Sequence, residues 1–329
     1  MRHRVKLIAL HEARQSLRRQ THRIGLYLRH PSSFDHDTGA HPERAERLRA
    51  IETALEGEGW LGLEPVEAPA ASRTQLERVH SGAHVDAIDE LCRRGGGMID
   101  LDTVASPGSF RAALHAAGGA AHAVDQLLAS GNGPAFCGLR PPGHHAERER
   151  AMGFCLFNNA AVAAAHALEE HGAERVFVLD WDVHHGNGTA AIFDATDSVL
   201  YASIHQSPLY PGTGDAADRG SGAGEGYTLN LPVPPGSGGE EFIGLVRERV
   251  VPALLDYAPR LVIVSAGYDA HREDPLAGCT LDDADYGAMA REVRAAADQV
   301  GAPVLVCLEG GYELDALARS VRETISALS

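Results

Sequence analysis

The chain has 329 residues, 44% of them hydrophobic, a length within reach of one large α/β domain. Its 45 acidic and 29 basic side chains give a formal net charge of −16, so no basic face of the kind that nucleic-acid-binding proteins use is expected. This acidity suits cationic substrates, although an acidic surface more often serves solubility alone. The five cysteines are scattered without a CxxC pair, which argues against a disulfide framework and favours a reducing compartment.

The first 22 residues are basic, and we expect them to form an N-terminal extension before one folded domain over residues 23–329. The apolar run inside this extension, Val5–Leu10, is short and contains Lys6, so it does not fit the core of a secretory signal. No segment of the sequence is long and apolar enough to span a membrane. We therefore expect a cytoplasmic protein that does not enter a membrane.

Short apolar runs recur along the chain, each followed by glycine, polar or ionisable residues. These runs are Ile24–Leu28, Pro134–Leu139, Arg175–Leu179, Val199–Ile204, Tyr227–Leu231, Arg260–Ser265 and Pro303–Leu308. Because they are continuous rather than alternating, they are typical of strands in a parallel sheet that is covered on both faces.

Helical patterns lie between these runs. Alanine-rich stretches predict helices over Ser109–Ala129 and Asn158–Glu170. A third helix face is indicated by Phe242, Leu245, Val246, Val250 and Leu254. The alternation of strands and helices predicts a single doubly wound α/β domain with a mostly parallel central sheet flanked by helices.

Four of the predicted strands end in loops that carry many ionisable side chains. These loops are Arg140–His145, Asp180–Gly188, Ala266–His271 and Glu309–Tyr312. In open α/β sheets, ligands bind beyond the carboxyl ends of the strands. We therefore expect all four loops to open onto one site at that edge of the sheet.

The second of these loops suggests a metal site. Asp182 and His184 are two residues apart, so in extended backbone both side chains point the same way. Asp269, just past another strand end, is the best candidate for a third ligand. Two aspartates and one histidine leave zinc with an open coordination position, as in catalytic sites. The simpler alternative is that these side chains only form hydrogen bonds within their loops. That alternative would explain a single Asp and His pair, but it does not explain four strand-end loops that all carry ionisable side chains.

The tandem His144-His145 provides candidate proton-transfer groups, because an imidazole has a pKa near ~6.5. Asp180 and Asn187 could orient the two rings by accepting their other N–H groups, although Asn187 would equally suit a helix cap. An isolated histidine pair would more often lie in a surface loop. Its place at a strand end favours catalysis.

Tyr312 follows two glycines and could donate a hydrogen bond to an oxyanion, whereas alone it would more simply be an aromatic residue packed on the sheet. Cys155 is flanked by apolar residues and is interpreted as a structural cysteine rather than a nucleophile. Zinc lowers the pKa of bound water toward ~7 and polarises a carbonyl, so these groups together indicate metal-assisted hydrolysis of an amide.

Several motifs of the chain resemble the histone deacetylase family, within the zinc-dependent arginase–deacetylase superfamily. These motifs are RPPGHHA (140–146), MGFCLFNN (152–159), DWDVHHGNGT (180–189), SAGYDAHREDPL (265–276) and LEGGYEL (308–314). The resemblance runs from about Ile24 to the C-terminus. Its motif sequences are similar to those of the class II branch and its bacterial relatives, including acetylpolyamine amidohydrolases. It implies the arginase–deacetylase fold, with a deacetylase catalytic domain over residues 23–329.

The resemblance also assigns roles to matched positions. The zinc ligands of the family, which holds one zinc ion per chain, match Asp182, His184 and Asp269. The catalytic groups match His144, His145, Tyr312, Asp180 and Asn187. Among these, His145 is the implied general base, Asp180 the partner of His144, and Asn187 stands where some members have aspartate. Since some weakly active members replace the tyrosine, the presence of Tyr312 favours an active enzyme.

The substrate tunnel is implied in the same way. Gly153, Phe154 and Tyr210 match the walls of a narrow acyl-lysine tunnel, with Tyr210 in place of the more common phenylalanine. Asp102 resembles a loop acid that grips the substrate backbone in some members. Leu276 stands where polyamine-selective relatives can place an acidic gatekeeper.

Three internal sites also follow from the resemblance. One potassium site would use Asp180, Asp182, His184 and Ser203, partly through backbone carbonyls. A second would use Phe193, Thr196, Val199 and Tyr227. Arg44 resembles an internal channel arginine that helps acetate to leave.

The resemblance implies a substrate that is an acetylated lysine peptide or a small acylated amine. Leu276 favours acyl-lysine or broad specificity, whereas the acidic composition favours acetylated polyamines. An arginase-like ureohydrolase would need more carboxylates for two manganese ions than the third loop offers. An inactive metal-binding scaffold or a reader of acetyl marks would not need Tyr312. Assembly into a homo-oligomer stays open.

Overall fold

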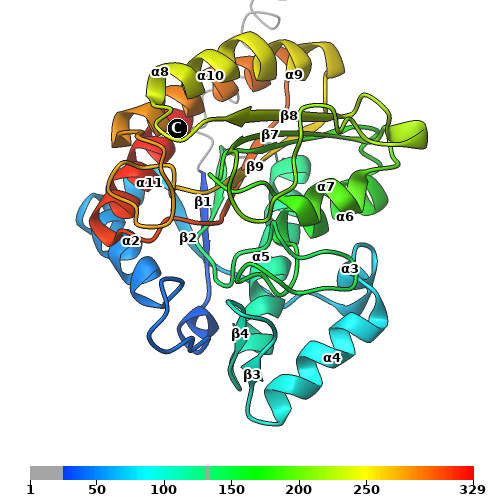
Figure 1. Ribbon diagram of the computed structural model, residues 1–329, viewed down its shortest axis with the longest axis vertical. Helices are drawn as coiled ribbons and strands as arrows, with labels where there is room; N and C mark the ends of the chain where they lie inside the picture. Colours follow the sequence, from blue (N-terminus) through cyan, green and yellow to red (C-terminus); the bar gives the residue numbers. More distant parts are fainter. Residues whose placement is uncertain (1–24, 131–132) are drawn as a thin grey trace, which may run out of the picture.

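In the computed structural model, which describes residues 25–130 and 133–329, eight parallel strands pair into one central sheet (Figure 1). In spatial order they are β2 (Glu64–Glu67), β1 (Leu26–Arg29), β5 (Ala135–Cys137), β10 (Val304–Leu308), β9 (Leu261–Ala266), β6 (Val176–Asp180), β7 (Val199–Gln206) and β8 (Thr228–Val233). The predicted doubly wound α/β architecture is therefore confirmed. Because all pairings in this sheet are parallel, the four loaded loops leave it at the same edge.

Every predicted apolar run forms a strand, with boundaries shifted by one or two residues. Ile24 and the expected extension over residues 1–22 lie outside the described residues. Strand β2 was not predicted, because its sequence Glu-Pro-Val-Glu has no apolar run and is largely exposed. It joins the sheet at its edge through backbone pairing with β1.

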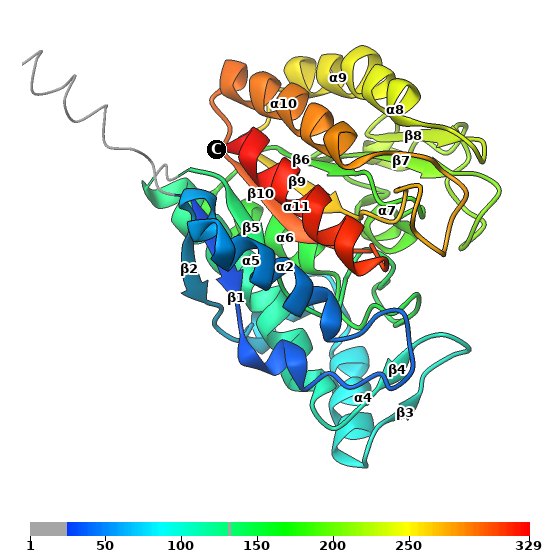
Figure 2. The same cartoon turned by 90° about the vertical axis from the view of Figure 1, so that its left-hand side faces the viewer.

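Successive residues of each strand pack against opposite helix layers. Leu28 and Val178 contact the layer that contains α3 (Arg73–Glu77), α4 (Gly82–Arg93), α5 (Ser109–Ser130) and α6 (Asn159–His171). Tyr27 and Phe177 contact the layer that contains α2 (Glu46–Gly57), α8 (Gly239–Leu245), α9 (Val251–Tyr257), α10 (Asp283–Val300) and α11 (Leu314–Leu328). Figure 2 shows α2, α11 and α10 side by side in this second layer. The core therefore lies on both faces of the sheet, as the continuous apolar strands predicted.

The third predicted helix is interrupted by a π-helical turn, η4 (Val246–Val250), between α8 and α9. Phe242, Val246, Val250 and Leu254 are fully buried, and Leu245 is partly buried. These four side chains are spaced four residues apart, whereas one α-helical turn takes about 3.6 residues. In a continuous α-helix each would therefore be rotated slightly from the one before, and the row would turn away from the sheet. The wider π turn keeps these side chains over the sheet.

The remaining elements are short. They are η1 (Pro31–Phe34), η2 (Gly59–Gly62), the antiparallel pair β3 (Gly97–Met98) and β4 (Val104–Ala105), α7 (Asn187–Phe193) and η3 (Gly222–Gly224). Among the described residues, no helix combines the length and apolar character that crossing a membrane requires.

Candidate active site

Asp182, His184 and Asp269 meet where β6 and β9, which are paired in the sheet, reach their carboxyl ends. One ligand atom from each residue lies within 4.8 Å of the others. His184 Nδ1 is 3.1 Å from Asp182 Oδ1 and 3.1 Å from Asp269 Oδ2. Both carboxylates are buried, so two acceptor oxygens and one imidazole nitrogen converge on one point.

The outer oxygens of both carboxylates are held by the backbone. The Gly310 N–H donates to Asp182 Oδ2 at 2.8 Å, and the Val183 N–H donates to Asp269 Oδ1 at 3.0 Å. A Cβ atom at Gly310 would lie 2.1 Å from Asp269 Oδ2 and 2.6 Å from Asp182 Oδ2, so only glycine fits against this pair. The carboxylates are thus fixed, with Asp182 Oδ1, which also accepts the His184 N–H at 2.9 Å, and Asp269 Oδ2 both facing the His184 ring.

Positive charge is strongly favoured at this cluster. Burial lowers the pKa of His184, but hydrogen bonds and charges from Asp182 and Asp269 outweigh burial and raise that pKa to about 10. Two buried carboxylates side by side need a counter-charge, which either a proton or a metal ion can supply. Two oxygen ligands and one imidazole nitrogen fit zinc with an open position.

The tandem histidines lie beside this cluster, each with a partner on its Nδ1 atom. His144 Nδ1 is 3.1 Å from Asp180 Oδ2, and His145 Nδ1 is 2.8 Å from Asn187 Oδ1. The Tyr201 hydroxyl donates to the same Asp180 oxygen at 3.0 Å. The two ring centres are 3.9 Å apart and both rings are buried. The side chain of Asn187 therefore contacts His145 instead of capping a helix.

Their surroundings move the two histidine pKa values apart. Burial lowers the pKa of His144, but the charges of Asp182 and Asp180 outweigh it and raise that pKa to about 10. Burial, His144 and His184 hold the pKa of His145 well below its ordinary value. A cation at the carboxylate cluster would lower the pKa of both histidines, opposing the rise at His144 and adding to the fall at His145. The arrangement keeps His145 neutral, as a base must be.

Glu309, at the end of β10, holds the loop of the tandem histidines. Its Oε2 accepts the N–H groups of Gly143 at 2.7 Å and His144 at 3.1 Å, and its Oε1 accepts the Ser265 hydroxyl at 3.0 Å. Burial raises the pKa of Glu309 to about 7. Sequence reasoning gave this residue no role, although an acid directly after a buried strand in a loaded loop was a usable signal.

Tyr312 is held by three other side chains. Asp274 Oδ2 accepts its backbone N–H at 2.6 Å, and the Phe154 ring packs edge-on with centres 5.8 Å apart. The guanidinium of Arg47 lies 5.0 Å from the centre of the Tyr312 ring. None of the hydrogen bonds among the described residues involves the Tyr312 hydroxyl, and the residue is 9% exposed, so the hydroxyl is available to a ligand.

Two of the expected tunnel residues, Tyr210 and Gly153, lie against His145. The rings of Tyr210 and His145 are 5.1 Å apart, and Tyr210 is 37% exposed. Gly153 has a φ of +55°, and a Cβ there would lie 2.3 Å from His145 Cδ2. Phe154 has a φ of +69°, which is strained for any residue other than glycine. Leu276 is half-buried.

Asp102 lies near Phe154, because the hydroxyl of the adjoining Thr103 accepts the Phe154 N–H at 3.1 Å. Burial and its neighbour Asp100 raise the pKa of Asp102, which also interacts with the backbone of Gly153. Burial and the charges of Asp102 and Asp100 raise the pKa of Tyr210.

The expectation that Arg44 lines an internal channel is wrong, because its side chain is exposed. Among the described residues, the fully buried arginines are Arg47, three residues further along, and Arg140. Arg47 Nε donates to the Gly311 carbonyl at 2.6 Å, and both guanidiniums pair with the buried Glu43. The motif located the segment correctly, but Arg44 precedes α2 and is exposed, whereas Arg47 lies in the first turn of α2 and is buried.

The residues expected at potassium sites fall in two places. Asp180 is in register with Ser203 across β6 and β7, next to Asp182 and His184. The other group surrounds the end of α7 and the start of β7. It consists of Phe193, Thr196, Val199 and Tyr227. The Tyr227 carbonyl accepts the Tyr201 N–H at 2.9 Å.

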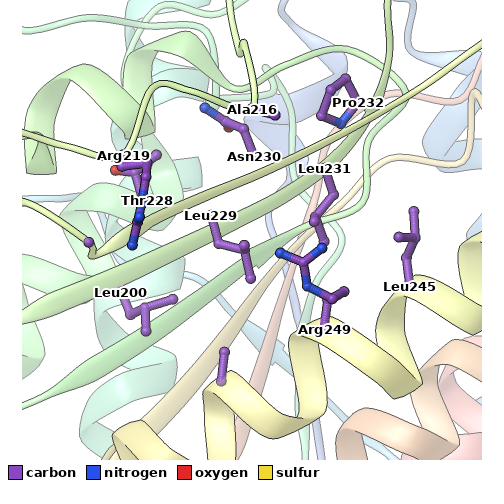
Figure 3. Close-up of a pocket in the computed structure, with 12 residues that line it drawn as sticks. Leu200, Ala216, Arg219, Thr228, Leu229, Asn230, Leu231, Pro232, Leu245 and Arg249 are labelled. Carbon is purple, nitrogen blue, oxygen red and sulfur yellow. The ribbon is translucent and has the colours of Figure 1, made fainter.

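A separate hollow of about 570 Å³ lies beside edge strand β8 (Figure 3). Leu229 and Leu231 line it, and Arg249 rises toward it from the adjoining helical segment. None of the histidine, aspartate or tyrosine side chains described above borders it.

The sequence was compared with known families and proteins. Residues 41–328 match the family model described as "Histone deacetylase domain". A "Probable deacetylase" of Methanothermobacter thermautotrophicus is 43% identical over 295 residues, which cover 88% of this chain and 87% of that protein. A "Histone deacetylase-like amidohydrolase" of Pseudomonas aeruginosa is 42% identical over 275 residues, 83% of this chain and 72% of that protein.

A plant relative and a solved structure are also similar. "Histone deacetylase 15" of Arabidopsis thaliana is 41% identical over 303 residues, which cover 90% of this chain but only 54% of that protein. The crystal structure of the HDA15 HD domain matches with a TM-score of 0.88 and 39% identity, covering 92% of this chain and 87% of that one.

Proposed function

The chain belongs to the histone deacetylase family, and we propose that this hydrolytic deacetylase is a zinc-dependent amidohydrolase that removes acetyl or other short acyl groups from acylated amines. The observation that carries this proposal is the convergence of three groups at one edge of the sheet. These are the Asp182, His184 and Asp269 cluster, the oriented His144-His145 pair, and the Tyr312 hydroxyl that has no other partner among the described residues.

Asp182, His184 and Asp269 would hold the zinc ion. When bound, zinc polarises the substrate carbonyl and lowers the pKa of water. His145 takes a proton from the attacking water through Nε2, because its Nδ1 faces Asn187. The Tyr312 hydroxyl donates a hydrogen bond to the carbonyl oxygen as it becomes an oxyanion. His144, whose protonated form Asp182 and Asp180 favour, donates a proton to the departing amine. The proton held by His145 then restores the charge of the adjoining His144, so the pair is reset for the next cycle.

The internal sites extend this proposal. We place potassium at the two groups named above, and we replace Arg44 by Arg47 as the internal arginine, because Arg47 is buried against the Tyr312 loop. A cytoplasmic location fits the five cysteines, all of which are buried and free.

Nε-acetyl-lysine in peptides is the first substrate class. Leu276 presents a neutral, half-buried side chain next to Asp274, whose carboxylate accepts its N–H at 3.0 Å. Acetylated polyamines are the second class. The charges of Asp100 and Asp102, which act on Tyr210, favour this class because they would attract a cationic amine. The deciding assay compares kcat/KM on an acetyl-lysine peptide with kcat/KM on N-acetylspermidine and N-acetylputrescine. A higher value on the peptide supports the first class, and a higher value on the polyamines supports the second.

Leu276→Glu is expected to raise the selectivity for acetylspermidine over the peptide by about tenfold, because a new carboxylate would pair with the distal ammonium of the polyamine. The ratio of the two kcat/KM values measures this. Leu276→Gln, which has the same size without the charge, is the matched control. A ratio that is equal in the two variants would remove Leu276 as the gatekeeper.

A further inference from the structure

The carboxylate of Glu147, which has no role in the proposed mechanism, contacts Asn187, the partner of the proposed general base His145. Glu147 lies two residues after His145, and its Oε1 accepts the Asn187 Nδ2–H at 2.7 Å. The Glu147 backbone is fixed on both sides: its carbonyl oxygen is 2.9 Å from His80 Nδ1, and its N–H donates to the Arg150 carbonyl at 2.9 Å. Since His80 Nε2 accepts the Asn158 N–H, its proton must be on Nδ1. The loop therefore presents Glu147 to Asn187 in a defined position.

This contact determines which way the Asn187 amide points. A carboxylate can only accept hydrogen bonds, so the NH2 group of Asn187 must face Glu147. The other two neighbours of Nδ2, the His145 carbonyl and Met152 Sδ, are also acceptors, but both lie at 3.4 Å. The amide oxygen is therefore left to face His145 Nδ1 at 2.8 Å.

The orientation of the amide in turn fixes the tautomer of His145. An amide oxygen accepts, so His145 must carry its proton on Nδ1 and keep the lone pair of Nε2 for the reaction. A reversed amide would turn its NH2 group toward Nδ1, which would then have to be unprotonated. The ring proton would move to Nε2, and the base would be lost.

We propose that Glu147 is a positioning residue of the reaction, which holds the Asn187 amide so that His145 presents an unprotonated Nε2. This inference rests on the proposed function of His145. A merely structural role for Glu147 would stabilise the loop without affecting the tautomer of His145. The experiment must therefore distinguish a structural role from a positioning role.

The test uses the zinc-loaded protein and an acetyl-lysine peptide. Glu147→Ala is expected to lower kcat about tenfold with little change in KM, the size typical of losing an outer hydrogen-bond partner. Glu149→Ala is the matched control, because Glu149 is an exposed carboxylate of the same loop and should leave kcat within about twofold. A hollow of about 290 Å³, lined by Glu147, Asn187 and His185 among others, adjoins the deleted carboxylate. Added formate can enter it and is expected to restore most of the lost kcat.

A second readout does not need turnover. Imidazole ¹⁵N signals of His145 should show the single Nδ1–H tautomer in the wild-type protein and a mixture in Glu147→Gln, whose amide can turn either way while the side chain keeps its size. The proposal is overturned if Glu147→Ala matches Glu149→Ala in kcat, if formate restores nothing, or if the His145 signals are the same in both proteins. If the wild-type protein hydrolyses no acyl amide, the proposed function fails, and the ¹⁵N signals alone decide whether Glu147 sets the tautomer.

Discussion

Replacing Tyr312 by phenylalanine is expected to lower kcat by a factor on the order of 10² to 10³, with KM and zinc content little changed. The substitution removes only the hydroxyl, which makes no hydrogen bond among the described residues. The ring would keep its contacts with Phe154 and Arg47, and the backbone N–H would keep its bond to Asp274. The loss therefore concerns the hydrogen bond that forms as the carbonyl oxygen gains charge.

Steady-state hydrolysis of an acetyl-lysine peptide measures this effect, with zinc content determined on the same samples. Tyr257→Phe is the control, because it also removes one tyrosine hydroxyl, which donates to the Asp197 carbonyl away from the site. Equal kcat values for wild type and Tyr312→Phe would show that the tyrosine does not stabilise the oxyanion. They would also support the inactive-scaffold or reader alternatives if both values were near zero.

Replacing His145 by alanine is expected to lower kcat/KM by 10² to 10⁴, roughly the range measured for the removal of a general base. His145 is the histidine whose pKa is held low by burial and by its histidine neighbours, so it is the unprotonated member of the pair. Asn187 fixes its Nδ1, which leaves Nε2 for the water. The neighbouring His144, whose pKa is raised, cannot replace it as a base.

The measurement is kcat/KM for the peptide across pH, together with zinc content and thermal unfolding. His122→Ala is the control for loss of an imidazole, because His122 lies on α5 outside the site. Wild-type activity in His145→Ala would assign the base to another group. Loss of zinc in this variant would show that His145 supports the metal cluster rather than the proton transfer.

The sequence predicted the parts of this molecule that depend on local pattern. Continuous apolar runs located the strands on both sides of the site, and the parallel arrangement then required their loops to meet. The expectation that loops at the carboxyl ends of parallel strands meet was enough to predict one cluster of Asp182, His184 and Asp269. These residues come from loops more than 80 residues apart in the chain. Strand β2 escaped prediction because an exposed edge strand needs no apolar run.

The residues that sequence reasoning missed act through contacts between distant segments. Glu309 reaches the histidine loop 166 residues earlier, and Asp274 reaches Tyr312 38 residues later. The local pattern of Asp274 does not distinguish a buried acceptor of backbone N–H groups from a surface acid, and the position of Glu309 after a buried strand does not show which backbone it holds. The Arg44 error has the same origin, because the choice between Arg44 and Arg47 depends on which of them contacts the distant Tyr312 loop, and Arg47 does so through the Gly311 carbonyl.

The measurement that tests the central claim most directly is a zinc titration of the metal-stripped protein, followed by acetate release from an acetyl-lysine peptide and from N-acetylspermidine. Activity on at least one of these substrates should be absent without metal and should reach a plateau at one zinc ion per chain. Asp269→Asn, which removes one charge from the cluster, should shift the titration to higher zinc concentrations. Full activity in the stripped protein, or a plateau that needs two metal ions per chain, would contradict a single zinc site at Asp182, His184 and Asp269.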